Sequence, residues 1–348
     1  MPDEPGGYYN PGAAALVSPQ QTVQARFYLG GMRWLPSFSD MRYRYTAIQG
    51  GVQNSTPWKI GGESAKVRTV LYGYRTKLDF GEQARTDERG NALGTFASAD
   101  DATHLGLSVA LLSIIDVGVG GTAKRVNTDL GNLKASTSAY DFGFMVRVPA
   151  VRGIEWATGE SLSLHQYLHP LIEGVFGAAW QNRGGNKMNY GPTIGSDPLP
   201  ANRRRGWSGK IGFAWVSENL ELELFGVRFA GETYRPQIEG TVTSKISEDS
   251  KSGTEISLLE TVDFRRGEYE DQDGEIYLDT KGVTIRSDGI SKVLAARLGD
   301  TSRSPQRDAL HFLANHLSIR WSHFDYEDRV LGGSPLGGIS HAQIEFAF

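Results

Sequence analysis

Long segments in which apolar and polar residues alternate with period two dominate this chain of 348 residues. The clearest is the last, where the apolar positions are Ala342, Ile344, Phe346 and Phe348 and the positions between them are polar or small. Period two is the repeat of a β-strand whose two faces meet different surroundings. The same alternation recurs at 105–111, 115–119 and 317–322. The chain is therefore predicted to be all-β.

The length of the alternating segments separates two all-β architectures. Many run for about 9–12 residues, which matches a tilted transmembrane strand of about 9–11 residues rather than the usual 5–6 of soluble sheets. About fourteen strands are expected, an even number as in bacterial barrels. They are placed near 22–29, 42–50, 66–76, 102–112, 114–126, 136–147, 171–182, 205–216, 219–229, 254–266, 275–287, 290–299, 310–324 and 340–348. A soluble secreted β-sandwich is the structural alternative.

The two ends of the chain bear on its location. The alternating last strand stops on the aromatic Phe348, as is typical of barrels inserted by the outer-membrane assembly machinery. No apolar run approaches the roughly 18–20 residues of a membrane-spanning helix. Residues 1–7 lack the basic and apolar regions of a secretory signal. We expect a bacterial outer-membrane protein whose signal peptide was removed or is absent from this sequence.

The links between predicted strands indicate an orientation. Very short links at Ser113 and at Ser217 and Glu218 suit periplasmic turns, and longer polar links at 77–101, 183–204, 230–253 and 325–339 suit extracellular loops. The stretch 148–170 breaks this scheme, because it is long and falls on the periplasmic side. We expect a short helix within it, around 162–168.

Charge and cysteine content exclude some classes of function. Lys and Arg number 36 and Asp and Glu number 40, so the formal net charge is 36 − 40 = −4. This balance argues against a nucleic-acid partner, which usually calls for a basic excess. With no cysteine, neither disulfides nor thiolate metal sites are available.

Several motifs in a shared order resemble the PorV/PorQ family, part of the wider FadL-like group of outer-membrane barrels. They are Asn-Pro-Gly-Ala-Ala-Ala-Leu at 10–16, Trp-Leu-Pro at 34–36, Asp-Met-Arg-Tyr at 40–43, Leu-Asp-Phe-Gly at 78–81, a strand pair ending at Lys124, Asp-Phe-Gly at 141–143, Gly-Gly-Asn-Lys-Met at 184–188 and Asp-Pro-Leu-Pro-Ala-Asn-Arg at 197–203. The resemblance covers roughly 8–216 and fades through the last third. It departs from the family at Gly12, Arg204 and 185–186.

The resemblance implies a fourteen-stranded barrel at 22–348 with an N-terminal plug at 1–21. It implies a non-catalytic partner or shuttle in type IX protein secretion and surface attachment. Its partners would be outer-membrane lipid or lipopolysaccharide and a large translocon barrel or secreted cargo, recognised by loops such as 77–101 and 230–253. The alternative is a FadL-like transporter of hydrophobic small molecules, which would need an apolar pocket in the lumen.

Two clusters are candidate site residues. Asn10 and Pro11 would form the plug motif, and they equally suit a turn before a short helix. Arg203, Arg204 and Arg205 could contact lipopolysaccharide phosphates through bidentate guanidinium bonds, or stand solvated at the rim.

The motifs for metal binding and for nucleophilic catalysis are incomplete. His165 and His169 would share a face of a helix, but no HExxH pattern accompanies them. No Gly-x-Ser-x-Gly elbow marks a nucleophile. The acidic run 271–275 lacks the ligand spacing of a calcium loop and suits a solvated turn. We expect no enzyme activity, no metal and no cofactor.

Overall fold

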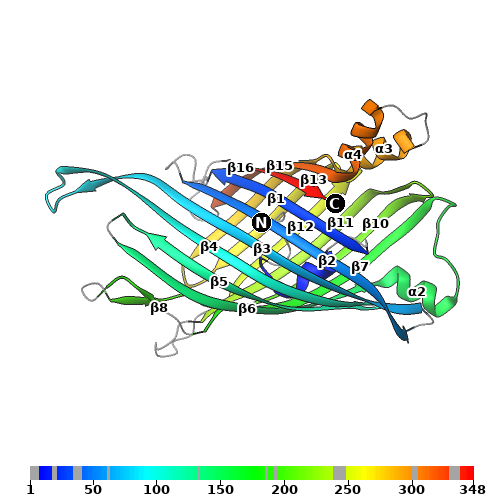
Figure 1. The fold of residues 1–348 in the computed structure, drawn as a ribbon, viewed down its shortest axis with the longest axis horizontal. Helices are drawn as coiled ribbons and strands as arrows, with labels where there is room; N and C mark the ends of the chain where they lie inside the picture. Colours follow the sequence, from blue (N-terminus) through cyan, green and yellow to red (C-terminus); the bar gives the residue numbers. More distant parts are fainter. Residues whose placement is uncertain are drawn as a thin grey trace.

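The computed structural model describes residues 8–17, 22–33, 41–60, 63–131, 133–184, 187–191, 195–237, 248–299, 305–328 and 338–348. Fourteen strands close into one antiparallel barrel in which β1 pairs with β16 (Figure 1). They are β1 (Val23–Arg33), β2 (Arg42–Ile60), β3 (Glu63–Thr86), β4 (Ala92–Leu112), β5 (Asp116–Asp129), β6 (Lys134–Pro149), β7 (Leu168–Arg183), β10 (Ala201–Ser217), β11 (Leu220–Gln237), β12 (Asp249–Leu258), β13 (Val262–Asp271), β14 (Ile276–Arg286), β15 (Leu317–Asp328) and β16 (Ile339–Ala347). The predicted antiparallel barrel of about fourteen strands is confirmed.

The remaining elements are short. Two small strands, β8 (Lys187–Asn189) and β9 (Ser196–Pro198), pair with each other outside the barrel sheet. The helices are η1 (Pro11–Ala13), α1 (Ala14–Val17), α2 (Ala150–Thr158), α3 (Asp288–Gly299) and α4 (Pro305–His316). No helix within the described ranges is long and apolar enough to cross a membrane.

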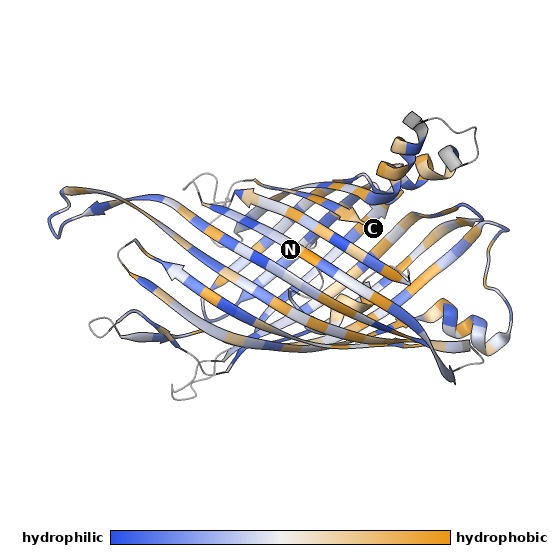
Figure 2. Cartoon of the chain, in the orientation of Figure 1, coloured by the Kyte–Doolittle hydropathy of each residue, from blue (hydrophilic) through white to orange (hydrophobic). Residues whose placement is uncertain are grey.

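The alternation of the sequence becomes an outer and an inner surface. On β4, Leu105 and Leu107 face outward and are 61% and 50% exposed, whereas His104 and Ser108 face the lumen and are 7% and 0% exposed. Hydrophobic and hydrophilic positions alternate along the strands on the side of the wall that Figure 2 shows. A closed sheet leaves no unpaired edge, and an apolar outer face is stable where the solvent is lipid. The barrel is therefore of the outer-membrane type, and the sandwich alternative is wrong.

The barrel has two different ends. At the end called here the terminal end, β1 begins, β16 stops, and α2, α3 and α4 lie (Figure 1). At the opposite end, called the hairpin end, β3 and β4 run on together to a turn at 87–91. The predicted loop at 77–101 is wrong, because the ladder continues from Glu82–Ala97 to Thr86–Ala92 beyond a bulge at Gly81. In this part of β3 and β4, polar residues on both faces obscure the two-residue period of a strand. Backbone pairing does not require an apolar face, so the strands continue.

Three predicted strands are corrected. The segment 254–266 is two strands, β12 and β13, joined by a turn in which Thr261 N donates to Leu258 O at 2.9 Å. The segment 290–299 is helix α3, and 310–316 belongs to helix α4 rather than to the following strand. The expected number of strands agrees with the structure because two errors cancel. β12 and β13 were expected to be one strand, and α3 was expected to be a strand.

Both errors have a local cause. In the turn after β12, Leu259 and Glu260 adopt left-handed φ values of 53° and 50°. Such turns normally carry Gly or Asn, so no residue type marked this one. In α3, Ile290, Val293 and Leu294 follow the i, i+3, i+4 spacing of a helix, which a search for period two overlooks.

The long link after β6 also differs from its prediction. The helix in this link is α2 rather than a helix around 162–168. Pro149 precedes α2, and Gly159, whose φ is 72°, follows it. Proline before a helix and left-handed glycine after it are the usual boundary signals. His165 therefore lies in a bridged turn and His169 in β7, so the two are not on one helix.

Candidate functional site: an occupied lumen and its vestibule

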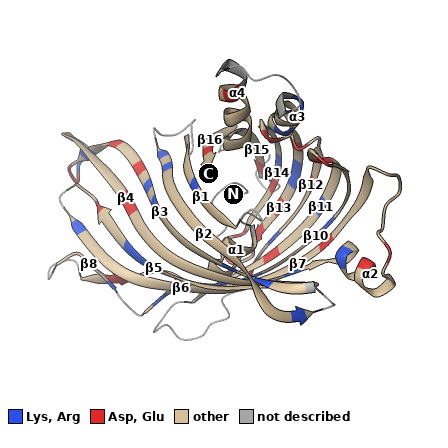
Figure 3. Ribbon diagram, turned by 45° about the vertical axis from the view of Figure 1, so that its right-hand side comes forward, with Lys and Arg blue, Asp and Glu red and all other residues tan. Residues whose placement is uncertain are grey.

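Residues 8–17, called here the inner segment, lie inside the barrel (Figure 3). Asn10 begins the helical turn, because its Oδ1 accepts from Gly12 N at 3.0 Å and its backbone O accepts from Ala13 N at 2.9 Å. Pro11 supplies a φ already suited to the first helical position. Asn10 and Pro11 thus form a turn before a short helix, and that helix lies within the lumen. Of the predicted plug at 1–21, residues 1–7 and 18–21 lie outside the described residues.

The inner segment is attached to the walls formed by β3, β4, β6 and β7. Asn10 Nδ2 donates to Phe144 O at 2.9 Å, and Gln181 Nε2 lies 3.2 Å from Tyr8 O. Ala15 N donates to Ser108 Oγ at 3.2 Å. These contacts come from side chains buried in the lumen, so the segment occupies one specific position.

Arg68 holds the far end of the inner segment. Its side chain is 1% exposed, and its Nη1 donates to Ala15 O at 3.1 Å while Nη2 donates to Gln53 Oε1 at 2.6 Å. A cation against a carbonyl near the end of a helix is a favourable arrangement. Beyond it, toward the terminal end, the fully buried Asp116 accepts from Arg147 at 2.6 Å and from Arg152 at 3.1 Å.

Glycines of the wall make room for the segment. A Cβ added at Gly120 would lie 2.4 Å from Pro11 O, one at Gly118 would lie 2.3 Å from Gly12 O, and one at Gly143 would lie 2.1 Å from Asn10 Oδ1. No larger residue fits where the strands approach the backbone of Pro11 and Gly12 and the side chain of Asn10 this closely. The wall is shaped to the inner segment on two neighbouring strands, β5 and β6.

A stack of aromatic rings covers the start of the segment. The rings of Tyr74 and His104 are stacked with centroids 4.0 Å apart, and the Tyr8 ring lies 5.3 Å from Tyr74. Beside them a buried ion pair joins Lys124 Nζ to Asp141 Oδ1 at 2.7 Å. Asp141 Oδ1 also accepts from Asn182 N at 2.8 Å. This side of the lumen is closely packed.

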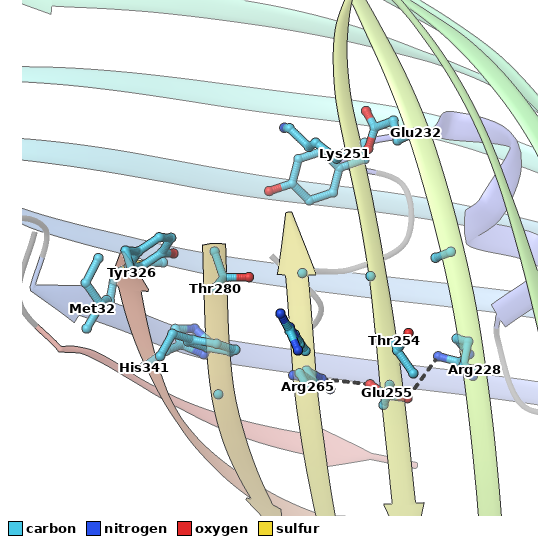
Figure 4. Close-up of a pocket in the computed structure, with 18 of the residues that line it drawn as sticks. Met32, Arg228, Glu232, Lys251, Thr254, Glu255, Arg265, Thr280, Tyr326 and His341 are labelled. Atoms are coloured by element: carbon cyan, nitrogen blue, oxygen red, sulfur yellow. Dashed lines mark hydrogen bonds and ion pairs between the residues drawn. The ribbon is translucent and has the colours of Figure 1, made fainter. Parts of the chain in front are cut away.

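The opposite side of the lumen holds a cavity of about 660 Å³, called here the vestibule (Figure 4). It lies between Tyr9 of the inner segment and the wall from β10 through β16 to β1. Four cationic side chains and two carboxylates that face the lumen line it: Arg204, Arg228, Lys251, Arg265, Glu232 and Glu255. Met32, Phe324, Tyr326 and His341 contribute apolar and aromatic surface.

The carboxylates of the vestibule are shared among the cations. Glu255 lies 2.7 Å from Arg265 and 3.5 Å from Arg228, as the dashed lines of Figure 4 indicate. Glu232 lies 2.5 Å from Arg204, whose guanidinium stands 4.8 Å over the Tyr9 ring. Lys251 Nζ lies 5.4 Å from the Tyr269 ring centre. The lining is positive, because four cations face two anions.

The three consecutive arginines at 203–205 point to different sides of the wall, because side chains alternate between the two faces of a strand. Arg204 faces the lumen and forms the Glu232 pair, whereas Arg203 and Arg205 face outward near the hairpin end, with Arg203 at 5.7 Å from the Trp180 ring. Arg203 and Arg205 therefore lie on the outer surface of the wall, and Arg204 does not. The sequence analysis did not predict three further cationic residues of the vestibule, Arg228, Lys251 and Arg265. The charged residues on the polar face of each predicted strand would have included them.

The histidine pair and the acidic turn take ordinary roles. Within the described residues no group of three or more His, Cys, Asp or Glu side chains could hold a metal ion. Gly274 N donates to Asp271 Oδ1 at 2.8 Å, so the acidic run is a hydrogen-bonded turn between β13 and β14.

Fold and lumen together define a membrane-spanning β-barrel of the outer-membrane type with part of its own chain folded inside. No family model and no curated protein matches the sequence. Among solved structures, the chain is similar to the β-domain of the Bordetella autotransporter BrkA, with TM-score 0.41, 8% identity, and 94% and 98% of the two chains covered. It is also similar to the translocator domain of autotransporter NalP from Neisseria meningitidis, with TM-score 0.39, 12% identity, and 94% and 89% covered. A variant of the Rh. blastica porin gives TM-score 0.33, 7% identity, and 94% and 99% covered.

Proposed function

We propose that this chain is a plugged barrel of the bacterial outer membrane that admits a small anionic molecule with an aromatic or apolar part. The hairpin end would face outward and the terminal end the periplasm, the orientation of barrels with short periplasmic turns. The action would be binding and passage, with no catalytic step. Arg203 and Arg205 would contact lipopolysaccharide phosphates at the rim.

The positive vestibule carries this proposal. Arginine and lysine side chains that outnumber their carboxylate partners favour an anion, and arginine adds planar hydrogen bonding to carboxylate or phosphate. Tyr326, Phe324 and Met32 would contact the apolar part. A purely hydrophobic ligand fits less well, because it would desolvate the six charged side chains that face the lumen there. Compared with the FadL-like alternative, a transporter of hydrophobic small molecules, the proposal restricts the ligand to an anion with an apolar part.

Charge reversal in the vestibule tests the ligand class. The variant Arg228→Glu with Lys251→Glu is expected to weaken binding of benzoate by at least about tenfold, since a hydrogen bond to a charged group contributes about 1.5–3 kcal/mol. Isothermal titration calorimetry of the purified barrel with benzoate and with benzylammonium measures the preference. The control, Arg44→Glu with Lys281→Glu, makes the same charge change on exposed outward-facing residues. Equal binding of both probes by the unmodified barrel would refute an anion site.

A second candidate function is a protein partner role in type IX secretion, as the PorV/PorQ resemblance implies. The projecting hairpin of β3 and β4 favours it, because it offers a rigid surface away from the lumen (Figure 1). Its turn is well formed. Asp87 accepts from Asn91 N at 2.8 Å and from Asn91 Nδ2 at 2.8 Å, and these bonds with the Asn91 side chain and backbone lower the pKa of Asp87.

Shortening the hairpin tests the partner role. Replacing residues 83–96 with a two-residue turn is expected to abolish recovery of a large translocon barrel or surface-attached cargo with the protein, while the barrel still migrates anomalously on an unboiled gel. The measurement is mild-detergent purification from native outer membranes followed by quantitative mass spectrometry. Removing β8 and β9 is the matched control. Recovery of the barrel alone from the unmodified strain would count against this candidate and leave transport.

A further inference from the structure

A second charged cavity lies at the terminal end of the barrel and is called here the terminal cavity. Its volume is about 470 Å³. Ser64 near the start of β3, Asp116 at the start of β5 and Arg147 near the end of β6 line it. The vestibule instead reaches Met32 near the end of β1 and Ile339 at the start of β16. The two cavities therefore lie toward opposite ends of the barrel.

The inner segment lies between the two cavities. Tyr9, near the start of the segment, lines the vestibule. Arg68, whose Nη1 donates to Ala15 O near the other end of the segment, lines the terminal cavity. A molecule that moves from the hairpin end to the terminal end therefore meets the vestibule before the inner segment and the terminal cavity after it.

The lining of the terminal cavity carries an excess of positive charge. The cationic side chains are Lys66, Arg68, Arg147 and Arg152, and the carboxylates are Asp116 and Glu155. Four cations thus face two anions, as in the vestibule, although the chain as a whole has a net charge of −4. Positive charge is therefore concentrated on both sides of the inner segment.

The two carboxylates of the terminal cavity are bonded to the protein itself. Asp116 Oδ2 accepts from Arg147 Nη2 at 2.6 Å, and Asp116 Oδ1 accepts from Arg152 Nη1 at 3.1 Å. Glu155 Oε1 accepts from Leu162 N at 2.9 Å. One carboxylate is thus divided between two guanidinium groups, and the other is bonded to a backbone amide.

The two remaining cations come from β3. Lys66 is exposed to the cavity and forms no ion pair with any residue that the structure describes. Arg68 is buried beside it, and its side chain donates to two uncharged oxygens, Ala15 O and Gln53 Oε1. The lining therefore favours an anion as the occupant of the terminal cavity.

Helix α2, at the terminal end in Figure 1, adds an aromatic side chain to the cavity. Arg152 Nη1 donates to Ser113 O at 2.5 Å, so α2 is held against the turn between β4 and β5. Trp156 of α2 is 55% exposed and lines the cavity together with Leu112 and Ile114. Cationic and apolar surfaces therefore meet here, as they do in the vestibule.

We propose that the terminal cavity is a second binding site for the small anion that the vestibule admits. The carboxylate of the ligand would lie between Lys66 and the guanidinium groups that share Asp116, and its apolar part would contact Trp156. A ligand that leaves the vestibule would then reach another favourable site before it leaves the barrel. The inference rests on the proposed function and adds a site to the same route.

Counting bound ligands tests this inference. Equilibrium dialysis of the purified barrel with radiolabelled benzoate gives the number of molecules bound and their dissociation constants. Lys66→Glu reverses a charge that no described carboxylate pairs with, and Trp156→Ala removes the aromatic surface from an exposed position on α2. The matched control is Lys187→Glu on β8, which makes the same charge change outside the barrel sheet. Anomalous migration on an unboiled gel verifies the fold of each variant.

The unmodified barrel is expected to bind two benzoate molecules. Lys66→Glu should raise the dissociation constant of one of them at least about tenfold, since it removes a hydrogen bond to a charged group and adds repulsion. Trp156→Ala should weaken the same molecule, and Lys187→Glu should leave both bound. Arg228→Glu with Lys251→Glu should weaken only the other molecule.

The outcomes separate this inference from the proposed function. A single bound benzoate that the vestibule variant removes, and that Lys66→Glu and Trp156→Ala leave unchanged, would overturn the second site and keep the vestibule. A single benzoate that Lys66→Glu removes and the vestibule variant leaves unchanged would support the terminal cavity and refute the vestibule. Equal weakening by Lys66→Glu and Lys187→Glu would reflect net charge alone and would overturn the second site.

Discussion

Replacing Gly120 with valine is expected to expel the inner segment and open the lumen. An added Cβ would stand 2.4 Å from Pro11 O, and the rest of the valine side chain would need still more room. β5 is held by ladders to β4 and β6 along its length, whereas the inner segment is held mainly by side-chain hydrogen bonds. Overpacking costs about 1–3 kcal/mol, so the inner segment rather than the wall should move. Planar-bilayer recordings should change from a closed state to steady, porin-like conductance.

The control for this variant is Gly174→Val on β7, where an added Cβ meets nothing within 4 Å. It introduces the same β-branched residue into a strand without touching the inner segment, and should stay closed. Both variants should keep the anomalous migration of a folded barrel. A Gly120→Val barrel that is folded yet closed would show that the inner segment does not block passage.

Replacing Lys124 with methionine is expected to lower the free energy of unfolding by about 3–5 kcal/mol, because it leaves a buried carboxylate without its partner. Lys124 and Asp141 are 7% and 1% exposed in their side chains and 2.7 Å apart. The urea midpoint of the barrel, followed by tryptophan fluorescence in detergent or vesicles, measures the loss.

Two further variants separate the cost of leaving a buried charge unpaired from the cost of breaking an ion pair that is exposed to solvent. The double variant Lys124→Met with Asp141→Asn should recover part of the loss, since no uncompensated charge remains. Arg75→Met breaks a pair of similar length, 2.9 Å to Asp101, in which the arginine is 66% exposed. That change should cost under about 1 kcal/mol. Similar losses for Lys124→Met and Arg75→Met would show that the lumen solvates Lys124 and Asp141 as bulk water does.

The sequence by itself determined the wall of the barrel. Period two assigns each residue of a strand to one of two faces, so the outward row Ala342, Ile344, Phe346 and Phe348 could be read directly. It was less informative where the period was weak or of another kind. The turn at Leu259 and Glu260 lacks glycine, and α3 follows a helical spacing, so one strand boundary and one helix were missed.

Only the tertiary structure decided what occupies the lumen. Alternation places Gly118, Gly120 and Gly143 on the inner face, but their close contacts with the Asn10 side chain and with the backbone of Pro11 and Gly12 depend on the register between β5 and β6. The vestibule has the same origin, because Arg228, Lys251 and Arg265 come from three strands. A strand's own sequence fixes which way a side chain points. The height at which it meets its neighbours is set by pairing around the closed barrel, and no single segment encodes that pairing.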